Sequence, residues 1–142
     1  MKTIYKILSL MVLVSIISCA SLPVNAATGT VYVSAGGSKY TDEFTQAYGN
    51  HSKCHMALLY VQFSGYAENC IPSSYYVRSR LYLKSPRTAA SDCASFSQVN
   101  SNGYDYWFWD GYATNGQQFV LKTNSNLSVY YSATFNFSAS VD

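Results

Sequence analysis

One cysteine and two histidines lie close together in the sequence, at His51, Cys54 and His55. Thiolate and imidazole groups are common zinc ligands, and a cysteine activated by a histidine is a common nucleophile. A tetrahedral zinc site needs about four ligands, however, and the chain has no further histidine. A catalytic cysteine also needs a group that orients its base, which short spacing alone does not provide. We therefore expect no metal site and no catalytic residue, and we interpret Cys54 as a structural cysteine flanked by surface imidazoles.

Carboxylates are the other residues that could do chemistry. Asp42 and Glu43 are adjacent, and Asp105 and Asp110 flank an aromatic segment. Glycoside hydrolysis needs two carboxylates held about 5 to 10 Å apart around a sugar, and no spacing in this sequence indicates such a shared cleft. The sequence also lacks a glycine-rich phosphate loop, a nucleophile elbow and a His-Glu-x-x-His helix. We expect a protein that is not an enzyme and that needs no cofactor.

The most concentrated feature is the aromatic segment from Tyr104 to Tyr112. Alternate side chains of a strand point to opposite faces, so both faces of this segment carry large rings. One interpretation is a platform for a glycan or a cell-surface protein, with aspartates accepting hydroxyl hydrogen bonds. The alternative, which we favour because aromatic rings dominate β-cores, is a central strand buried on both faces. The candidate ligand-binding residues are Tyr104, Asp105, Tyr106, Trp107, Trp109 and Asp110.

Three cations share one face of another expected strand, at Arg78, Arg80 and Lys84, close to Tyr76 and Tyr82. They could attract anionic wall polymers or lipid headgroups. More often such charges keep an exposed sheet face soluble and discourage edge-to-edge pairing, and we favour that interpretation.

Residues 1–26 have the anatomy of a signal peptide. Lys2 and Lys6 precede the apolar run 7–17, which is shorter than the roughly 20 residues that cross a bilayer. Small residues before Ala26 predict cleavage there. We therefore expect a secreted protein, extracellular or associated with the cell wall, without a membrane span. The alternative is a lipid anchor at Cys19, which lies in a segment resembling a lipoprotein cleavage box.

Beyond this leader, residues 27–142 fit a single domain. Lysines and arginines balance aspartates and glutamates there, so the clustered basic surface that nucleic acids require is missing and no nucleic-acid partner is expected. Three cysteines remain, Cys54, Cys70 and Cys93. Either Cys54–Cys70 or Cys70–Cys93 could form a disulfide, leaving one thiol over, or all three could stay reduced. The oligomeric state is not specified.

The alternation of apolar and polar residues predicts strands throughout the domain. From Leu127 to Val141 every second residue is apolar, and Tyr75 to Lys84 has one core-like and one charged face. Other expected strands cover residues 30–34, 56–63, 94–99, 104–109 and 118–123. Asn102-Gly103 and Asn115-Gly116 predict turns, and only residues 42–48 suggest a helical turn. We expect an all-β fold, an antiparallel β-sandwich or small barrel.

The combination of a leader, alternating strands rich in Tyr, Ser and Asn, and the closing segment Tyr130-Tyr131-Ser132 with Phe135 and Phe137 resembles small exported β-rich proteins of Gram-positive bacteria. Some of these are grouped with lactococcin-972-like bacteriocins. The resemblance implies a secreted β-sandwich that acts on the envelope of competing cells. The interval Cys54 to Cys70 is also similar to the first disulfide loop of tendamistat-type amylase inhibitors, but the Trp-Arg-Tyr triplet of that family is absent.

Two functions follow as expectations. The first is a secreted, non-catalytic binding or surface-interaction protein whose aromatic segment contacts its ligand. The alternative is a secreted antagonist, bacteriocin-like or an enzyme inhibitor, that acts on competitor cells.

Overall fold

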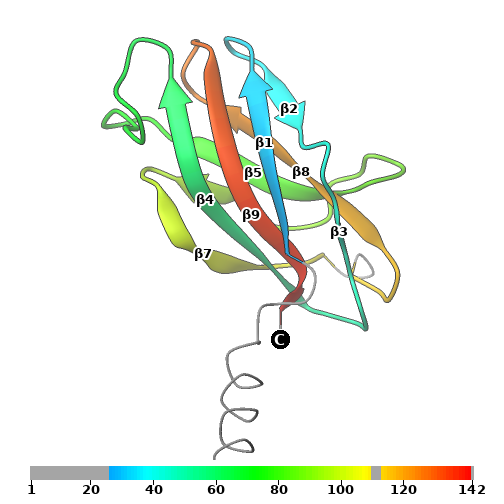
Figure 1. Cartoon of the computed structure of the whole chain (residues 1–142). Coiled ribbons are helices and arrows are strands. Elements are labelled where there is room, and N and C mark those ends of the chain that lie inside the picture. The colour runs from blue at the N-terminus through cyan, green and yellow to red at the C-terminus, as the bar shows by residue number, and fades with distance from the viewer. Residues whose placement is uncertain (1–25, 110–112, 142) are drawn as a thin grey trace, which may run out of the picture.

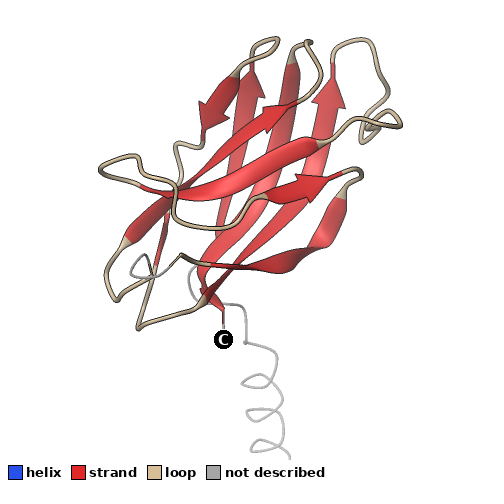
Figure 2. Cartoon of the chain, turned by 180° about the vertical axis from the view of Figure 1, so that it is seen from behind, coloured by secondary structure: helices blue, strands red, loops and turns tan. Residues whose placement is uncertain are grey.

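The structure of the protein is a computed structural model that describes residues 26–109 and 113–141. These residues form antiparallel strands and no helix, arranged as two sheets that face each other (Figures 1 and 2). The first sheet has the order β1-β9-β4-β7, and the second has the order β2-β8-β5-β6, with β3 also paired to β8. This sandwich confirms the predicted all-β class. The bounds are β1 (Ala27–Val33), β2 (Ser38–Tyr40), β3 (Thr45–Gln46), β4 (Lys53–Phe63), β5 (Val77–Leu83), β6 (Ala94–Phe96), β7 (Asn100–Trp107), β8 (Gln118–Ser125) and β9 (Tyr131–Val141).

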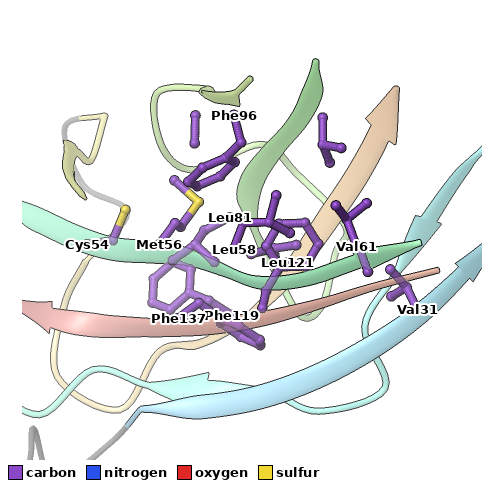
Figure 3. Packing of buried hydrophobic residues seen from close by; sticks show 14 of the residues in the cluster. Val31, Cys54, Met56, Leu58, Val61, Leu81, Phe96, Phe119, Leu121 and Phe137 are labelled. Carbon is purple, nitrogen blue, oxygen red and sulfur yellow. The ribbon is translucent and has the colours of Figure 1, made fainter. Parts of the chain in front are cut away.

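The core lies between the two sheets and is built from the alternate residues that the sequence pattern marks as apolar. β9 contributes Phe135 and Phe137, both fully buried, while Asn136 between them faces outward. Figure 3 shows Leu58 of β4 with Leu81 and Leu121 of the second sheet in this layer. Each fully buried side chain of this size contributes about 1.5 to 3 kcal/mol. Burial of one face per strand therefore holds the two sheets together.

Halfway along β4, the positions whose side chains point into the core shift by one residue. Cys54, Met56 and Leu58 face the core, and after an irregular register between Leu58 and Tyr60 the inward residues become Val61 and Phe63. An extra residue in one strand of an antiparallel pair reverses the side-chain alternation beyond it. Because of this bulge, both halves of β4 direct apolar side chains into the core, although the inward positions are even-numbered in the first half and odd-numbered in the second.

Asn102-Gly103 does not form the predicted turn between strands, because both residues lie inside β7. Gly103 has φ of +63° and lies next to the irregularity in the β4 and β7 pairing, between Met56 and Leu58. A Cβ at position 103 would lie 2.5 Å from the carbonyl oxygen of Met56. The glycine is therefore needed for a bulge, where positive φ and close backbone approach coincide.

The helical turn expected at residues 42–48 is also wrong. Thr45 and Gln46 form β3, which pairs with β8, and the N–H of Ala47 donates to the carbonyl of Gln117. The Thr45 hydroxyl accepts a hydrogen bond from the N–H of Ala139 at 3.3 Å. Tertiary hydrogen bonds to two other strands replace the local bonds of a helical turn.

None of the predicted disulfides is present, since Cys54, Cys70 and Cys93 are all free. Cys70 follows Asn69, whose N–H donates to Val61 near the far end of β4, about 23 Å along the strand from Cys54. A disulfide needs Cα atoms within about 7 Å. Cys93 turns instead to the outer face of the second sheet, where it borders a hollow with Arg80.

The predicted signal peptide, with cleavage after Ala26, and the alternative lipid anchor at Cys19 concern residues 1–25, which lie outside the described part of the chain. Both stay predictions. In residues 26–109 and 113–141 no helix is long and apolar enough to cross a membrane.

The three free thiols should differ sharply in reactivity. Burial raises the pKa of the Cys54 thiol from its ordinary value of 9.0 to about 12, and only the thiolate reacts. Native protein treated with an alkylating reagent at mildly alkaline pH should be modified at the exposed Cys70 and Cys93 and not at Cys54. Peptide mapping by mass spectrometry measures each site, and the denatured protein, which should react at all three, is the control. Rapid native modification of Cys54 would contradict its burial.

Candidate binding site

β7 lies at the edge of the first sheet, so the interpretation of the aromatic segment as a central strand buried on both faces is wrong. The strand pairs with β4 alone, and its other edge is not covered by a strand of that sheet. Tyr104 is 57% exposed, Trp107 is 56% exposed and Trp109 is 40% exposed. Large exposed rings in an edge strand are unusual, because Trp and Tyr are on average well buried. The aromatic segment is therefore a surface feature.

Phe108 fixes the end of this segment to both sheets. Its N–H donates to the carbonyl of Ser52, and its ring is buried against Phe119 of β8, with ring centroids 5.0 Å apart. On either side of it, the carbonyl of Trp107 accepts a hydrogen bond from the N–H of Asp92, and the N–H of Trp109 donates to the carbonyl of Ala90. Because Phe108 points inward, its two tryptophan neighbours are directed outward.

Trp107 lies on the outer face of the first sheet beside charged neighbours from β4. Lys53 is directly opposite it in the register, and the Lys53 ammonium lies 4.7 Å from the centre of the ring. The next pair along the same face is His55 and Asp105, whose Nδ1 and Oδ1 atoms are 2.8 Å apart. The carboxylate of Asp105 is thus already held by the imidazole, which leaves ring stacking as the main interaction open to a ligand at Trp107.

Trp109 is held from two directions. Its indole Nε1 donates to the Asp92 carboxylate at 3.2 Å, and the guanidinium of Arg80 lies 5.1 Å from the centre of its ring. Both contacts reduce the freedom of the side chain. A ring that is already ordered loses less conformational entropy when it binds a ligand.

A hollow of about 350 Å³ lies beside the two tryptophans. The loop before β4 contributes an amide and a hydroxyl from Asn50 and Ser52, and Thr114 contributes a further hydroxyl. His51 is fixed at this hollow by a hydrogen bond of 2.7 Å between its Nε2 and the carbonyl of Tyr48. Rings beside amides and hydroxyls are suited to bind a sugar. The lining residues are Asn50, His51, Ser52, Trp107, Phe108, Trp109, Ala113 and Thr114.

The structure brings only part of the predicted site together. Tyr106 is half-buried against the core, and its carbonyl accepts a weak hydrogen bond from the Cys54 thiol at 3.5 Å. Tyr104 is exposed but does not line the hollow, and Asp105 is paired with His55. Asp110 lies outside the described residues. The site therefore retains Trp107 and Trp109 from the sequence prediction.

Asn50, Ser52 and Thr114 could not be predicted as site residues from the sequence, because their local pattern is that of ordinary loop residues. The sequence suggests His51 only as a metal ligand or as a base for Cys54, and both interpretations are rejected in favour of a surface imidazole. In the structure, Cys54 faces the core while His55 faces outward, so the two side chains point away from each other. Among residues 26–109 and 113–141, no group of three His, Cys, Asp or Glu side chains is arranged to hold a metal ion.

A second hollow, of about 480 Å³, lies at the opposite end of β9. It is bordered by Tyr32 of β1, Gln62 of β4 and Tyr130, which precedes β9. Tyr32 and Tyr130 are highly exposed, at 78% and 67%. A site at these two tyrosines could not be predicted from the sequence, because their proximity depends on the pairing of β1 with β9.

No protein-family model matches the chain, and no curated protein sequence matches it. Among solved structures, the chain is similar to a mitogen from Yersinia pseudotuberculosis, with a TM-score of 0.40, 12% identity, and coverage of 83% of this chain and 88% of the mitogen. It is also similar to a chain of Broad Bean Stain Virus, with a TM-score of 0.32, 13% identity, and coverage of 84% and 79%. A family two carbohydrate esterase from Cellvibrio japonicus gives a TM-score of 0.25 at 10% identity, with coverage of 79% and 33%. Scores this low carry no functional argument.

Phe108 should contribute far more to stability than the exposed rings around it. Replacing it with alanine removes a buried ring from between the sheets and should lower the free energy of unfolding by about 3 to 5 kcal/mol. The Tyr104→Ala variant is the matched control, since it removes an exposed ring from the same strand and should change stability by no more than about 0.5 kcal/mol. Guanidinium unfolding followed by circular dichroism measures both. Equal effects of the two substitutions would contradict the anchoring role of Phe108.

Proposed function

We propose that the protein is a secreted, non-catalytic binding protein that holds a neutral glycan against Trp107 and Trp109. The observation that carries this proposal is the outward position of both tryptophans, on either side of the buried Phe108 and beside a hollow of about 350 Å³. The chain contains only these two tryptophans. Two exposed indole rings at one edge of a sandwich support a binding role better than a structural one, because burying them in the core would stabilise the fold.

The chemistry of the lining supports a sugar as the ligand. Indole rings offer flat apolar faces for stacking with a sugar ring, while their surroundings supply polar groups. Asn50, Ser52 and Thr114 offer an amide and two hydroxyls to the hydroxyl groups of the ligand. Few polar groups placed around apolar rings are typical of small-ligand sites.

The uncharged polar groups of the described lining support a neutral ligand. Lys53 and Arg80 lie against the rings of Trp107 and Trp109, and neither lines the hollow. Glycoside hydrolysis would need two carboxylates across the sugar, and the described lining contains none. The alternative function as an antagonist of competitor cells stays a prediction, since no feature of the site favours it.

Tryptophan fluorescence provides a direct test, because both emitting residues lie at the proposed site. Titration with soluble oligosaccharides of cellulose, xylan, chitin and β-glucan, excited where tyrosine does not absorb, should change the emission for at least one sugar. Loss of a stacking ring in Trp107→Ala or Trp109→Ala should weaken that binding by about tenfold, measured by isothermal titration calorimetry.

The Tyr32→Ala and Tyr130→Ala variants are matched controls, since each removes an exposed ring at the other end of the first sheet. They should bind as tightly as the unmodified protein. Circular dichroism confirms that each variant is folded. If the tyrosine variants lose binding and the tryptophan variants do not, the glycan site lies at the second hollow instead, and a lack of binding to every sugar would refute the proposal.

A further inference from the structure

The outer face of the second sheet carries a cluster of positive charge, which we call the cationic face and define by Arg78, Arg80 and Lys122. In the β5 and β8 register, Arg78 is opposite Asn124 and Arg80 is opposite Lys122. Their neighbours on β5, Val77, Ser79 and Leu81, are buried in the core. The three cations therefore share the outward face of two adjacent strands, with their Cα atoms at the spacings of about 5 Å across strands and 7 Å along them that a sheet imposes.

The pairing of Arg80 with Lys122 is unfavourable for the sheet itself. Like charges placed directly opposite each other destabilise an antiparallel pair. Among residues 26–109 and 113–141, neither side chain forms an ion pair with a carboxylate that would offset the repulsion. The register therefore concentrates positive charge at this point of the sheet, which an anionic ligand would offset.

Aromatic rings hold these cations in place without neutralising their charge. The guanidinium of Arg78 lies 4.4 Å from the centre of the Tyr76 ring. The ammonium of Lys122 lies 5.2 Å from the Tyr40 ring and 5.4 Å from the Tyr82 ring. The two tyrosines themselves pack edge to face, with centroids 5.3 Å apart. A cation over a ring is attracted to it but keeps its full charge, so the positive groups are ordered and remain available to an anion.

The cationic face borders a hollow of about 240 Å³ that has unused hydrogen-bond donors. In the described part of the chain, the side chains of Arg78, Arg80 and Lys122 donate no hydrogen bond, and the buried Nε of Arg80 has no acceptor. The terminal N–H groups of these side chains can therefore donate to a ligand in the hollow, whereas the buried Nε of Arg80 lies out of its reach. Ser38 and Asn124 add a hydroxyl and an amide to the same lining.

We propose that the cationic face binds an anionic carbohydrate polymer, one that carries sulfate, phosphate or carboxylate groups. Two arginines and a lysine match the charged groups of such a polymer, because guanidinium donates two parallel hydrogen bonds to an oxyanion. Ser38 and Asn124 supply hydrogen bonds to sugar hydroxyls, and Tyr82 supplies a ring. This site faces a different hollow from the neutral glycan site, and the two sites share one contact, between Arg80 and the ring of Trp109.

The same features favour a polymer of sugars over a membrane or a nucleic acid. Phe44, the exposed phenylalanine near this sheet, is covered by the ammonium of Lys84 at 3.6 Å, so its ring is not free to insert among lipid tails. The charges outside the leader balance overall, whereas nucleic-acid binding surfaces are strongly basic. Local charge beside hydroxyl and amide groups suits a ligand that carries both anionic groups and hydroxyls.

Calorimetric titration of the protein with dextran sulfate, and with uncharged dextran of the same length, tests the proposal. Dextran sulfate should bind, and more weakly as salt is added, while uncharged dextran should not bind at this face. Arg80→Gln and Lys122→Gln should each weaken binding by about tenfold, as expected for the loss of a hydrogen bond to a charged group.

Lys39→Gln is the matched control. It removes the same charge from β2, next to Tyr40, but Lys39 is opposite Thr123 and lies outside the hollow. It should leave binding unchanged, and circular dichroism confirms the fold of each variant. Equal weakening by Lys39→Gln, or equal binding of uncharged dextran in the Trp107→Ala variant, would overturn the proposal. Tighter binding to single-stranded DNA or to phosphatidylglycerol vesicles would reassign the face to those ligands.

Discussion

The burial of one face of each sheet is the constraint on which the rest of the structure depends. Phe135 and Phe137 of β9 meet Phe119 and Leu121 of β8 in a single apolar layer, and this layer is the main source of free energy that can offset the loss of chain entropy. Since each strand has only two faces, most residues between the inward-facing ones are left at the surface, and Ala57, Val120 and Ser138 are exceptions that are buried. The fold therefore produces two broad outer faces whose side chains are free to serve other purposes.

At the edge of the sandwich, the same constraint leaves Trp107 and Trp109 at the surface. β7 has one neighbour in its sheet, and the chain beyond it crosses toward the second sheet through hydrogen bonds to Ser52 and Ala90. Phe108 fills the end of the core against Phe119. The alternation of an extended chain then leaves Trp107 and Trp109 outside. One buried ring thus accounts for the exposure of two others.

The two outer faces differ in chemistry because the outward-facing residues of the two sheets differ. The first sheet presents mainly hydroxyls and amides, such as Thr30 and Thr134, which hydrogen-bond to each other at 2.9 Å. The second presents cations supported by rings, as with Arg78 on Tyr76. Arg80 connects the cationic face to the aromatic site through its contact with Trp109. Within the described strands, the outer face of the first sheet thus carries charges of both signs only beside Trp107, at Lys53 and Asp105, whereas the cationic face carries positive charge alone.

The sequence by itself determined the local periodicity and hence the class of fold. Alternation in β5 and β9 predicted which residues of each strand are buried, because a period of two leaves no other arrangement that covers the apolar face. It also placed a turn at Asn115-Gly116, where Gly116 adopts a φ of +87°. These predictions depend only on neighbouring residues.

Only the tertiary structure decided which strand lies at an edge, and this determined the sites. An aromatic strand such as β7 has the same local pattern whether it is central and buried or peripheral and exposed, so the sequence favoured the wrong alternative. The proximity of Asn50, Thr114 and Trp107, the opposition of Arg80 to Lys122, and the distance between Cys54 and Cys70 likewise depend on strand order and register. These are set by the packing of the whole core, since pairing free energies are shared among residues far apart in the chain.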